Sequence, residues 1–136
     1  MLLLDTHAWI WLITGDAEFG KSKALQRVLN SARKGKLRVS AISLWEVSML
    51  AAKGRVQFNI PVLNWLKDAL NAPGISLEPL SPEIAVESTT LPQHFHGDPA
   101  DRILVATARC HNYELVTRDR KIIEYGDAGF CKVVTI

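Results

Sequence analysis

Short apolar runs alternate along this chain with longer segments whose apolar residues recur at helical spacing. The short runs predict strands over residues 2–4, 37–40, 75–77, 114–117 and 132–136, with a weaker candidate at 56–58. The longer segments predict helices over residues 8–13, 22–32, 43–53, 61–72, 81–90 and 100–110, and a short helix that begins at residue 119. Because strands alternate with helices throughout, we expect an α/β fold with a mostly parallel central sheet flanked by helices.

Two of the predicted helix starts carry acidic residues. Ser43 and Glu46 have the spacing of a capping box, which predicts that Ser43 opens its helix. Asp98 directly precedes Pro99, and this pair predicts the start of the helix over residues 100–110. Both signals place carboxylates near helix N-termini, where the helix dipole favours negative charge.

Length and composition fit one globular domain over residues 1–136. The chain has 136 residues, of which 48% are hydrophobic, and this is enough for a core of its own. No apolar run is long enough to span a bilayer, and the first residues lack the pattern of a signal peptide, so we expect a cytoplasmic protein. Cys110 and Cys131 do not have metal-site spacing, and we assign them no role.

The formal net charge of +2 hides a strongly basic segment. Seven of the 16 Lys and Arg residues, and no acidic residue, lie between positions 21 and 38. A local positive field of this kind suits a polyanion such as RNA, and Lys34, Lys36 and Arg38 are its candidate contacts. A solvated helix face followed by a basic turn explains the same charges at least as well.

Four carboxylates stand next to predicted strand ends or helix starts: Asp5, Glu46, Asp101 and Asp119. Parallel strands present their carboxyl ends at one edge of a sheet, so residues far apart in sequence can form one acidic pocket there. Each acid alone has a structural explanation, as a helix cap, a capping-box partner, a first-turn acid or a turn residue. Structural caps have no reason to gather at one edge, however, and the joint pattern predicts a functional site.

Such a cluster of carboxylates needs a cation, because mutual repulsion raises their pKa values and destabilises the site. Mg²⁺ or Mn²⁺ fits best, since these ions take oxygen ligands and leave positions for water and phosphate. Zinc would call for cysteine and histidine ligands at metal-site spacing, which this chain lacks. We expect His7, His94 and His96 to be loop residues or polar neighbours outside the ligand set.

Four segments of the sequence carry a resemblance to a known family. They read LLLDTH at 2–7, SLWEV at 43–47, HGDPADRILVATA at 96–108 and LVTRD at 115–119. With these segments the chain resembles the PIN-domain ribonucleases, specifically the VapC-type toxins of toxin–antitoxin pairs, nearly end to end. The resemblance implies a single PIN-like domain that hydrolyses RNA phosphodiester bonds and has an antitoxin protein as its partner.

The resemblance also implies roles for individual residues. The family positions that match Asp5, Glu46, Asp101 and Asp119 hold the metal ions, and the position of Thr117 often supports them. By its spacing, Asp98 sits at the helix cap one turn before Asp101, where it organises the loop and can act as an outer neighbour of the metal site.

Basic and aromatic residues suggest contacts beyond the acids. Arg102, Arg118 and Arg120 lie close in sequence to the proposed site and could grip flanking phosphates, whereas a solvent-facing charge is the simpler explanation for nearby Lys121. Trp9 and Trp11 cannot share one helix face at their spacing. We therefore expect one of them to be exposed, in a groove for an apolar antitoxin segment or in the self-association surface of a homodimer.

Other α/β proteins with acids at strand ends fit this sequence less well. An aspartyl phosphatase needs a second acid two residues after the first, where this chain has His7. A phosphoacceptor signalling domain needs paired acids at the first strand end and a late lysine, and neither arrangement is present. No phosphate-cradling glycine loop is present either. A PIN-type protein that processes or binds RNA without a toxin role remains an open alternative.

Overall fold

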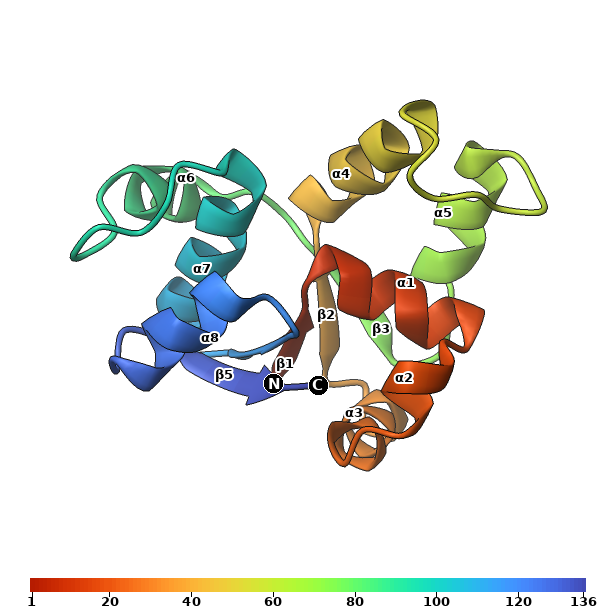
Figure 1. Ribbon diagram of the computed structural model, residues 1–136, viewed down its shortest axis with the longest axis horizontal. Helices are drawn as coiled ribbons and strands as arrows, with labels where there is room; N and C mark the ends of the chain where they lie inside the picture. The colour runs from red at the N-terminus through yellow and green to blue at the C-terminus, as the bar shows by residue number, and fades with distance from the viewer.

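Five strands and eight helices alternate along the chain in the computed structural model, which describes residues 1–136 (Figure 1). The strands are β1 (Leu2–Leu4), β2 (Leu37–Ser40), β3 (Ile75–Glu78), β4 (Glu114–Thr117) and β5 (Lys132–Thr135). The helices are α1 (Thr6–Thr14), α2 (Ala17–Gly20), α3 (Ala24–Arg33), α4 (Ala41–Ala52), α5 (Val62–Leu70), α6 (Pro82–Thr89), α7 (Pro99–His111) and α8 (Arg120–Asp127). The α/β alternation predicted from the sequence is confirmed.

All five strands form one parallel sheet in the order β3-β2-β1-β4-β5. The chain first adds β2 and β3 on one side of β1, then crosses over to add β4 and β5 on the other side. Doubly wound sheets of this kind bind ligands outside the carboxyl ends of the strands, at the point where the winding reverses. Here that point lies between β1 and β4, whose pairing runs from Leu2 with Glu114 to Leu4 with Val116.

Successive residues of β1 face opposite sides of the sheet. Leu2 and Leu4 pack in the core under α1 to α5, whereas Leu3 packs in the core under α6, α7 and α8. Figure 1 shows these two groups of helices on opposite sides of the strands. The three leucines are at most 2% exposed, as expected for a central strand of a parallel sheet that is covered on both faces.

The four tryptophans differ in exposure. Trp9 and Trp65 are buried and meet edge to face, with ring centroids 5.3 Å apart. Trp11 is half-buried and Trp45 is 58% exposed. The expectation that Trp9 or Trp11 is exposed is wrong, because the half-buried Trp11 packs against the same core as Trp9. The exposed indole is Trp45 of α4.

Two segments differ in kind from the predicted elements. Residues 17–20 form the short helix α2, which is too brief to leave a periodic pattern in the sequence. Residues 56–58 form no strand. Phe58 instead stacks on Trp65 of α5, with ring centroids 4.3 Å apart. None of the helices combines the length and the apolar character needed to cross a membrane.

Candidate metal centre

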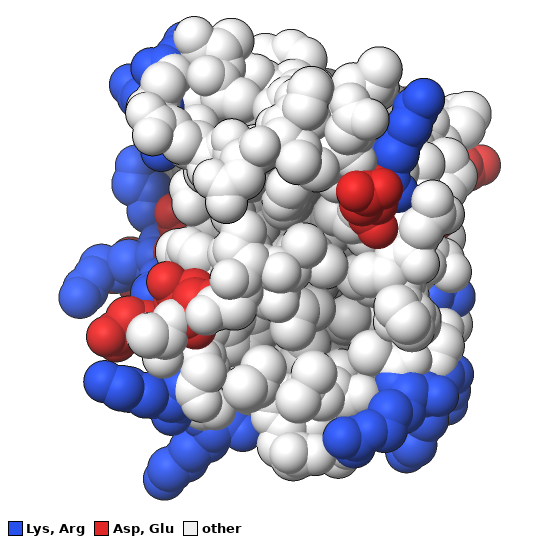
Figure 2. Space-filling view, turned by 90° about the vertical axis from the view of Figure 1, so that its right-hand side faces the viewer, with Lys and Arg blue, Asp and Glu red and all other residues white.

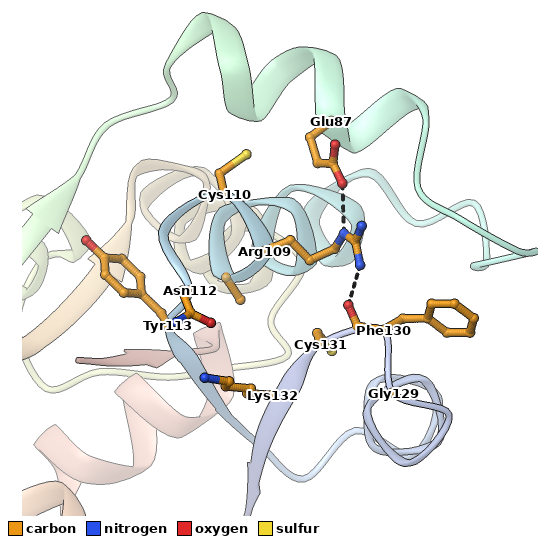
Figure 3. A pocket seen from close by; sticks show the side chains of 10 residues that line it. Glu87, Arg109, Cys110, Asn112, Tyr113, Gly129, Phe130, Cys131 and Lys132 are labelled. Carbon is orange, nitrogen blue, oxygen red and sulfur yellow. Dashed lines mark hydrogen bonds and ion pairs between the residues drawn. The ribbon is translucent and has the colours of Figure 1, made fainter.

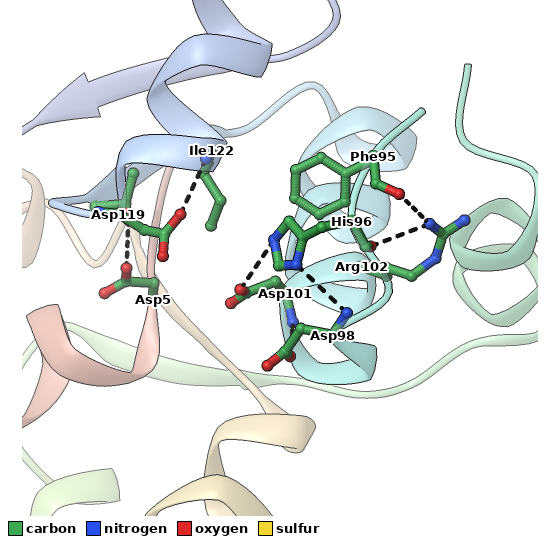
Figure 4. A network of polar contacts seen from close by, with 9 residues as sticks. Asp5, Phe95, His96, Asp98, Asp101, Arg102, Asp119 and Ile122 are labelled. Carbon is green, nitrogen blue, oxygen red and sulfur yellow. Dashed lines mark hydrogen bonds and ion pairs between the residues drawn. The ribbon is translucent and has the colours of Figure 1, made fainter. Parts of the chain in front are cut away.

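A cleft of about 200 Å³ opens at the carboxyl edge of the sheet, beside the ends of β1 and β4. It therefore lies at the reversal of winding, where ligand sites of this architecture are found. Figure 4 shows Asp5 and Asp119 on one side of this region and the start of α7 on the other. The four acids expected to meet all line the cleft, which is formed by Asp5, Thr6, His7, Glu46, Asp98, Asp101, Leu104 and Asp119.

Asp5 lies at the centre of a chain of hydrogen bonds that joins β1 to β4. Its Oδ1 accepts the backbone N–H of Ala8 at 2.8 Å and thereby caps α1. Its Oδ2 accepts the hydroxyl of Thr117, and the same hydroxyl oxygen accepts the N–H of Asp119 at 3.0 Å. Asp119 in turn caps α8 by accepting the N–H of Ile122 at 3.1 Å. Thr117 thus fixes two of the acids relative to each other.

Glu46 reaches the cleft from the middle of α4. Its Oε1 accepts the hydroxyl of Thr6, which also lies 2.9 Å from the hydroxyl of Ser43. The predicted capping box is wrong: α4 begins at Ala41, and Ser40 caps it by accepting the N–H of Ile42 at 3.1 Å. Ser43 is fully buried one turn into the helix, so its side chain bonds across to α1 instead of to its own helix end.

Asp98 and Asp101 stand one turn apart at the start of α7. Asp98 caps the helix by accepting the N–H of Asp101 at 3.0 Å, as its spacing predicted, and Pro99 occupies the first helical position. Asp101 therefore lies in the first turn of a capped helix, where the helix dipole places partial positive charge near its carboxylate.

The electrostatics of the cleft favour a bound cation. Burial raises the pKa of Asp5 to about 6, although its hydrogen bonds from Thr117 and Ala8 oppose the shift. Burial raises the pKa of Asp101 to about 7, and the nearby carboxylates of Asp98, Asp119, Glu46 and Asp5 raise it further. A divalent cation removes this repulsion, and an oxygen-rich donor set suits hard ions. Asp5, Glu46, Asp101 and Asp119 could hold such an ion.

His96 is a member of this constellation that the sequence interpretation left out of the site. Its Nε2 and one oxygen each of Asp101 and Asp119 lie within 4.8 Å of one another. The sequence signal was its position two residues before the Asp98 cap, but the loop conformation that turns the ring inward leaves no periodic pattern.

The predicted basic contacts are distributed unequally around the cleft. The guanidinium of Arg118 lies over the ring of Trp11, 4.2 Å from its centroid, in an adjoining hollow of about 300 Å³ that Asp5 and Asp119 also line. Arg120 is exposed at the start of α8, directly after Asp119. Arg102 instead donates to backbone carbonyls, which does not favour a contact with phosphate.

The basic segment is not part of this site. Lys34 and Lys36 lie in the turn that leads into the amino end of β2, and Arg38 is the second residue of that strand. The acids lie at the carboxyl ends of the strands, so the sheet separates the two groups. The structure therefore does not bring Lys34, Lys36 or Arg38 to the acidic cleft, and a solvated basic turn explains their charges.

A larger hollow of about 510 Å³ lies elsewhere, at the end of α7 and the start of β5 (Figure 3). Its acid, Glu87, is paired with Arg109 at 2.7 Å, and Arg109 also donates to the carbonyl of Phe130. Burial raises the pKa of both thiols there, that of Cys131 to about 11, so neither Cys110 nor Cys131 is an activated nucleophile. The volume of a hollow alone therefore does not identify the candidate functional site.

Comparison with known proteins agrees with this geometry. A family model described as the PIN domain matches residues 2–128. The chain is 37% identical over 121 residues to Ribonuclease VapC22 of Mycobacterium tuberculosis, which covers 89% of this chain and 88% of that protein. A toxin-antitoxin complex from Klebsiella pneumoniae contains a chain that superposes with a TM-score of 0.68 at 29% identity, with 99% and 97% of the two chains covered. VapBC2 from Rickettsia felis, bound to a promoter DNA fragment, shares the fold with a TM-score of 0.70 at 14% identity, with 98% and 97% covered. This chain belongs to the PIN-domain family.

Proposed function

We propose that this protein is a divalent-metal-dependent endoribonuclease and the toxin of a toxin–antitoxin pair. The observation that carries the proposal is the convergence of four carboxylates on one cleft at the reversal of winding of a PIN fold. The relatives support it, because the 37% identical protein is named a ribonuclease and the 29% identical chain comes from a toxin-antitoxin complex. An RNA substrate and a cognate antitoxin are the partners that follow from this proposal.

Mg²⁺ or Mn²⁺ is the cation that suits the carboxylate oxygens best. When bound, such an ion supplies Lewis-acid activation of water and stabilises charge on the phosphodiester. We assign Asp5, Glu46, Asp101 and Asp119 to hold it. A carboxylate that already sits in its required geometry loses little freedom when it ligates, and hydrogen bonds from Thr117 and Thr6 supply that order to Asp5 and Glu46.

Two exposed arginines beside the acidic cleft suit the negatively charged RNA backbone. Arg118 and Arg120 flank Asp119 in sequence and are exposed, so their guanidinium groups can pair with phosphates on either side of the scissile bond. The ring of Trp11 under Arg118 restricts the guanidinium, which lowers the entropy lost when it binds phosphate. The RNA then lies across the mouth of the acidic cleft.

A cleavage assay on a panel of RNAs tests the nuclease proposal. We expect the purified protein to cut RNA with Mg²⁺ or Mn²⁺ and not with a chelator, and we expect Asp5→Asn to be inactive. Asn keeps an oxygen for the helix cap, so loss of activity would report the lost charge rather than a lost fold. Cleavage in chelator, or undiminished cleavage by Asp5→Asn, would overturn the metal-dependent mechanism.

Growth of an expressing host separates a toxin from an RNA-processing enzyme. Induced wild-type protein should arrest growth, whereas Asp5→Asn at the same expression level should not. RNA cleavage in the test tube without growth arrest would favour the processing role, since both proteins would share the chemistry and differ in the cellular target.

A further inference from the structure

The loop before α7 brings an imidazole beside Asp101, one of the acids that line the cleft. Nε2 of His96 lies 3.2 Å from Oδ2 of Asp101, and each of the two side chains is only 20% exposed. The Nε2 atom itself is buried and has no aligned hydrogen-bond partner. A ring nitrogen placed in this way has two possible roles: it can ligate a metal ion directly, or it can donate a hydrogen bond that orients a ligating carboxylate.

The other ring nitrogen distinguishes these roles. Nδ1 of His96 accepts the backbone N–H of Asp98 at 3.4 Å (Figure 4). A ring nitrogen that accepts a hydrogen bond uses its lone pair and carries no proton, so the neutral ring holds its proton on Nε2. The Nε2–H then lies 3.2 Å from Oδ2 of Asp101, and Nε2 has no lone pair for a metal ion.

The backbone on which the ring stands is held by Arg102. Its guanidinium donates from Nη1 to the carbonyl oxygens of Phe95 at 2.9 Å and His96 at 3.3 Å, and from Nε to that of Ser88 at 2.8 Å. Figure 4 shows the bonds to Phe95 and His96 beside the ring. Because Arg102 directly follows Asp101 on α7, one turn of helix holds both the carboxylate and the loop that carries the imidazole.

We propose that His96 is a positioning residue, which donates from Nε2 to Oδ2 of Asp101 and leaves the other carboxylate oxygen for the cation. This inference rests on the proposed metal-dependent function and adds to it a residue outside the ligand set. The two atoms are 3.2 Å apart, which is already within hydrogen-bond distance. A buried donor without a partner is costly, and Asp101 supplies the acceptor.

The position of the ring proton can be measured on the wild-type protein. In long-range ¹H–¹⁵N correlation spectra we expect His96 in the Nε2–H form, both in chelator and at saturating Mg²⁺. A change to the Nδ1–H form on addition of Mg²⁺ would make His96 a ligand and overturn the positioning role. The Nδ1–H form in chelator would overturn it as well.

Two substitutions separate the hydrogen bond from the bulk of the ring. The side-chain amide of His96→Gln can still donate to Asp101, whereas His96→Leu cannot. In calorimetric titrations with Mg²⁺ and without RNA, we expect His96→Leu to bind at least about tenfold more weakly and His96→Gln to recover most of the affinity. His94→Leu is the matched control, because His94 is exposed two residues earlier in the same loop.

Each titration outcome bears on the proposal. Wild-type affinity in His96→Leu would remove His96 from the metal centre, and an equal loss in the Gln and Leu variants would overturn the donor role. Failure of the wild type to bind Mg²⁺ would overturn both this inference and the proposed function. Intact Mg²⁺ binding without RNA cleavage would count against the proposed nuclease function alone.

Discussion

At the scale of single residues, acids of this cleft make structural contacts that are separate from the metal-binding role we propose for the site. Asp5, Asp98 and Asp119 each cap a helix through one carboxylate oxygen. A carboxylate has a second oxygen, which for Asp5 accepts the Thr117 hydroxyl. The structural and the functional interpretation of each acid are therefore compatible, and substitutions that keep the oxygen but remove the charge separate them.

Glu46→Gln tests the charge of an acid whose side chain caps no helix. Glu46 lies inside α4, where it accepts the Thr6 hydroxyl. Gln keeps that acceptor, so we expect the free energy of unfolding to stay within about 1 kcal/mol of wild type, the scale of one hydrogen bond. We expect Mg²⁺ affinity, measured by calorimetry, and RNA cleavage to fall strongly. Wild-type values of both would remove Glu46 from the ligand set.

Asp98→Asn is the complementary change, in a residue that we place outside the ligand set. Asn caps a helix about as well as Asp, so α7 should keep its start and Asp101 its position. We expect most of the cleavage activity to remain, measured as kcat/KM on the same RNA. Complete loss would show that Asp98 contacts the cation itself.

The stability of the metal-free protein should fall as the pH rises from about 4 to about 7. The pKa of Asp5 and of Asp101 is raised from 3.8 to about 6 and about 7 in the folded chain. In that window the folded state binds more protons than the unfolded state, so raising the pH favours unfolding. Urea denaturation in chelator at both ends of the window measures the effect.

Two controls accompany this measurement of stability against pH. Asp101→Asn should flatten the pH dependence, because it removes the group with the higher pKa. Saturating Mg²⁺ should restore stability at pH 7, because an ion that binds only the folded state stabilises it. Stability of the chelated wild type that rises with pH throughout would contradict the repulsion we describe.

At the scale of elements, the strands and the start of α7 were predictable, whereas the start of α4 and the loop before α7 were not. The strand 37–40 was predicted with its observed bounds, since Leu37 and Val39 are apolar residues two positions apart directly after the turn at residues 34–36. Ser40 lies directly before α4 and Ser43 lies in its first turn, and only the tertiary contact of Ser43 with Thr6 decides which of them caps. His96 was missed for the same reason, since three carbonyl bonds from Arg102 shape the backbone in and around its loop.

Arg102→Ala should disorder the loop that precedes α7. The change removes a cation that bonds three backbone carbonyls, and we expect roughly 2 kcal/mol of stability to be lost because those acceptors lose a charged donor. Arg118→Ala is the control, since its guanidinium is exposed and rests on Trp11. Thermal denaturation of both variants checks this, and equal stabilities would show that Arg102 does not anchor the loop.

At the scale of the whole molecule, the acidic cleft and the basic segment around residues 34–38 lie at opposite ends of the sheet. The acids lie at the carboxyl ends of the strands, and Lys34 and Lys36 lie before the amino end of β2. Figure 2 shows that, on the side of the molecule it presents, Lys and Arg gather mainly at the rim while much of the middle carries no charge. Under the proposed function, the basic segment therefore lies away from the cleft where we place the RNA.

Neutralising Lys34, Lys36 and Arg38 together should leave RNA binding unchanged. These residues lie at the opposite end of the strands from the cleft. The slope of log RNA affinity against log salt concentration should therefore match that of the wild type. Arg118→Ala should make that slope shallower by about 0.7, the contribution of one phosphate contact on a single strand. Anisotropy titrations in chelator measure both slopes, and a shallower slope in the triple variant would restore the basic segment as an RNA contact.

The hydrogen bond between Thr117 and Asp5 joins residues 112 positions apart. A ribosome synthesises Asp5 long before Thr117, so the central strand β1 can pair with β4 only after the residues of β4 have emerged. A nascent chain that ends before Glu114 has Asp5, Glu46 and Asp101 but neither β4 nor Asp119. Under the proposed function, the active centre on a nascent chain therefore cannot assemble until Thr117 and Asp119 have been synthesised.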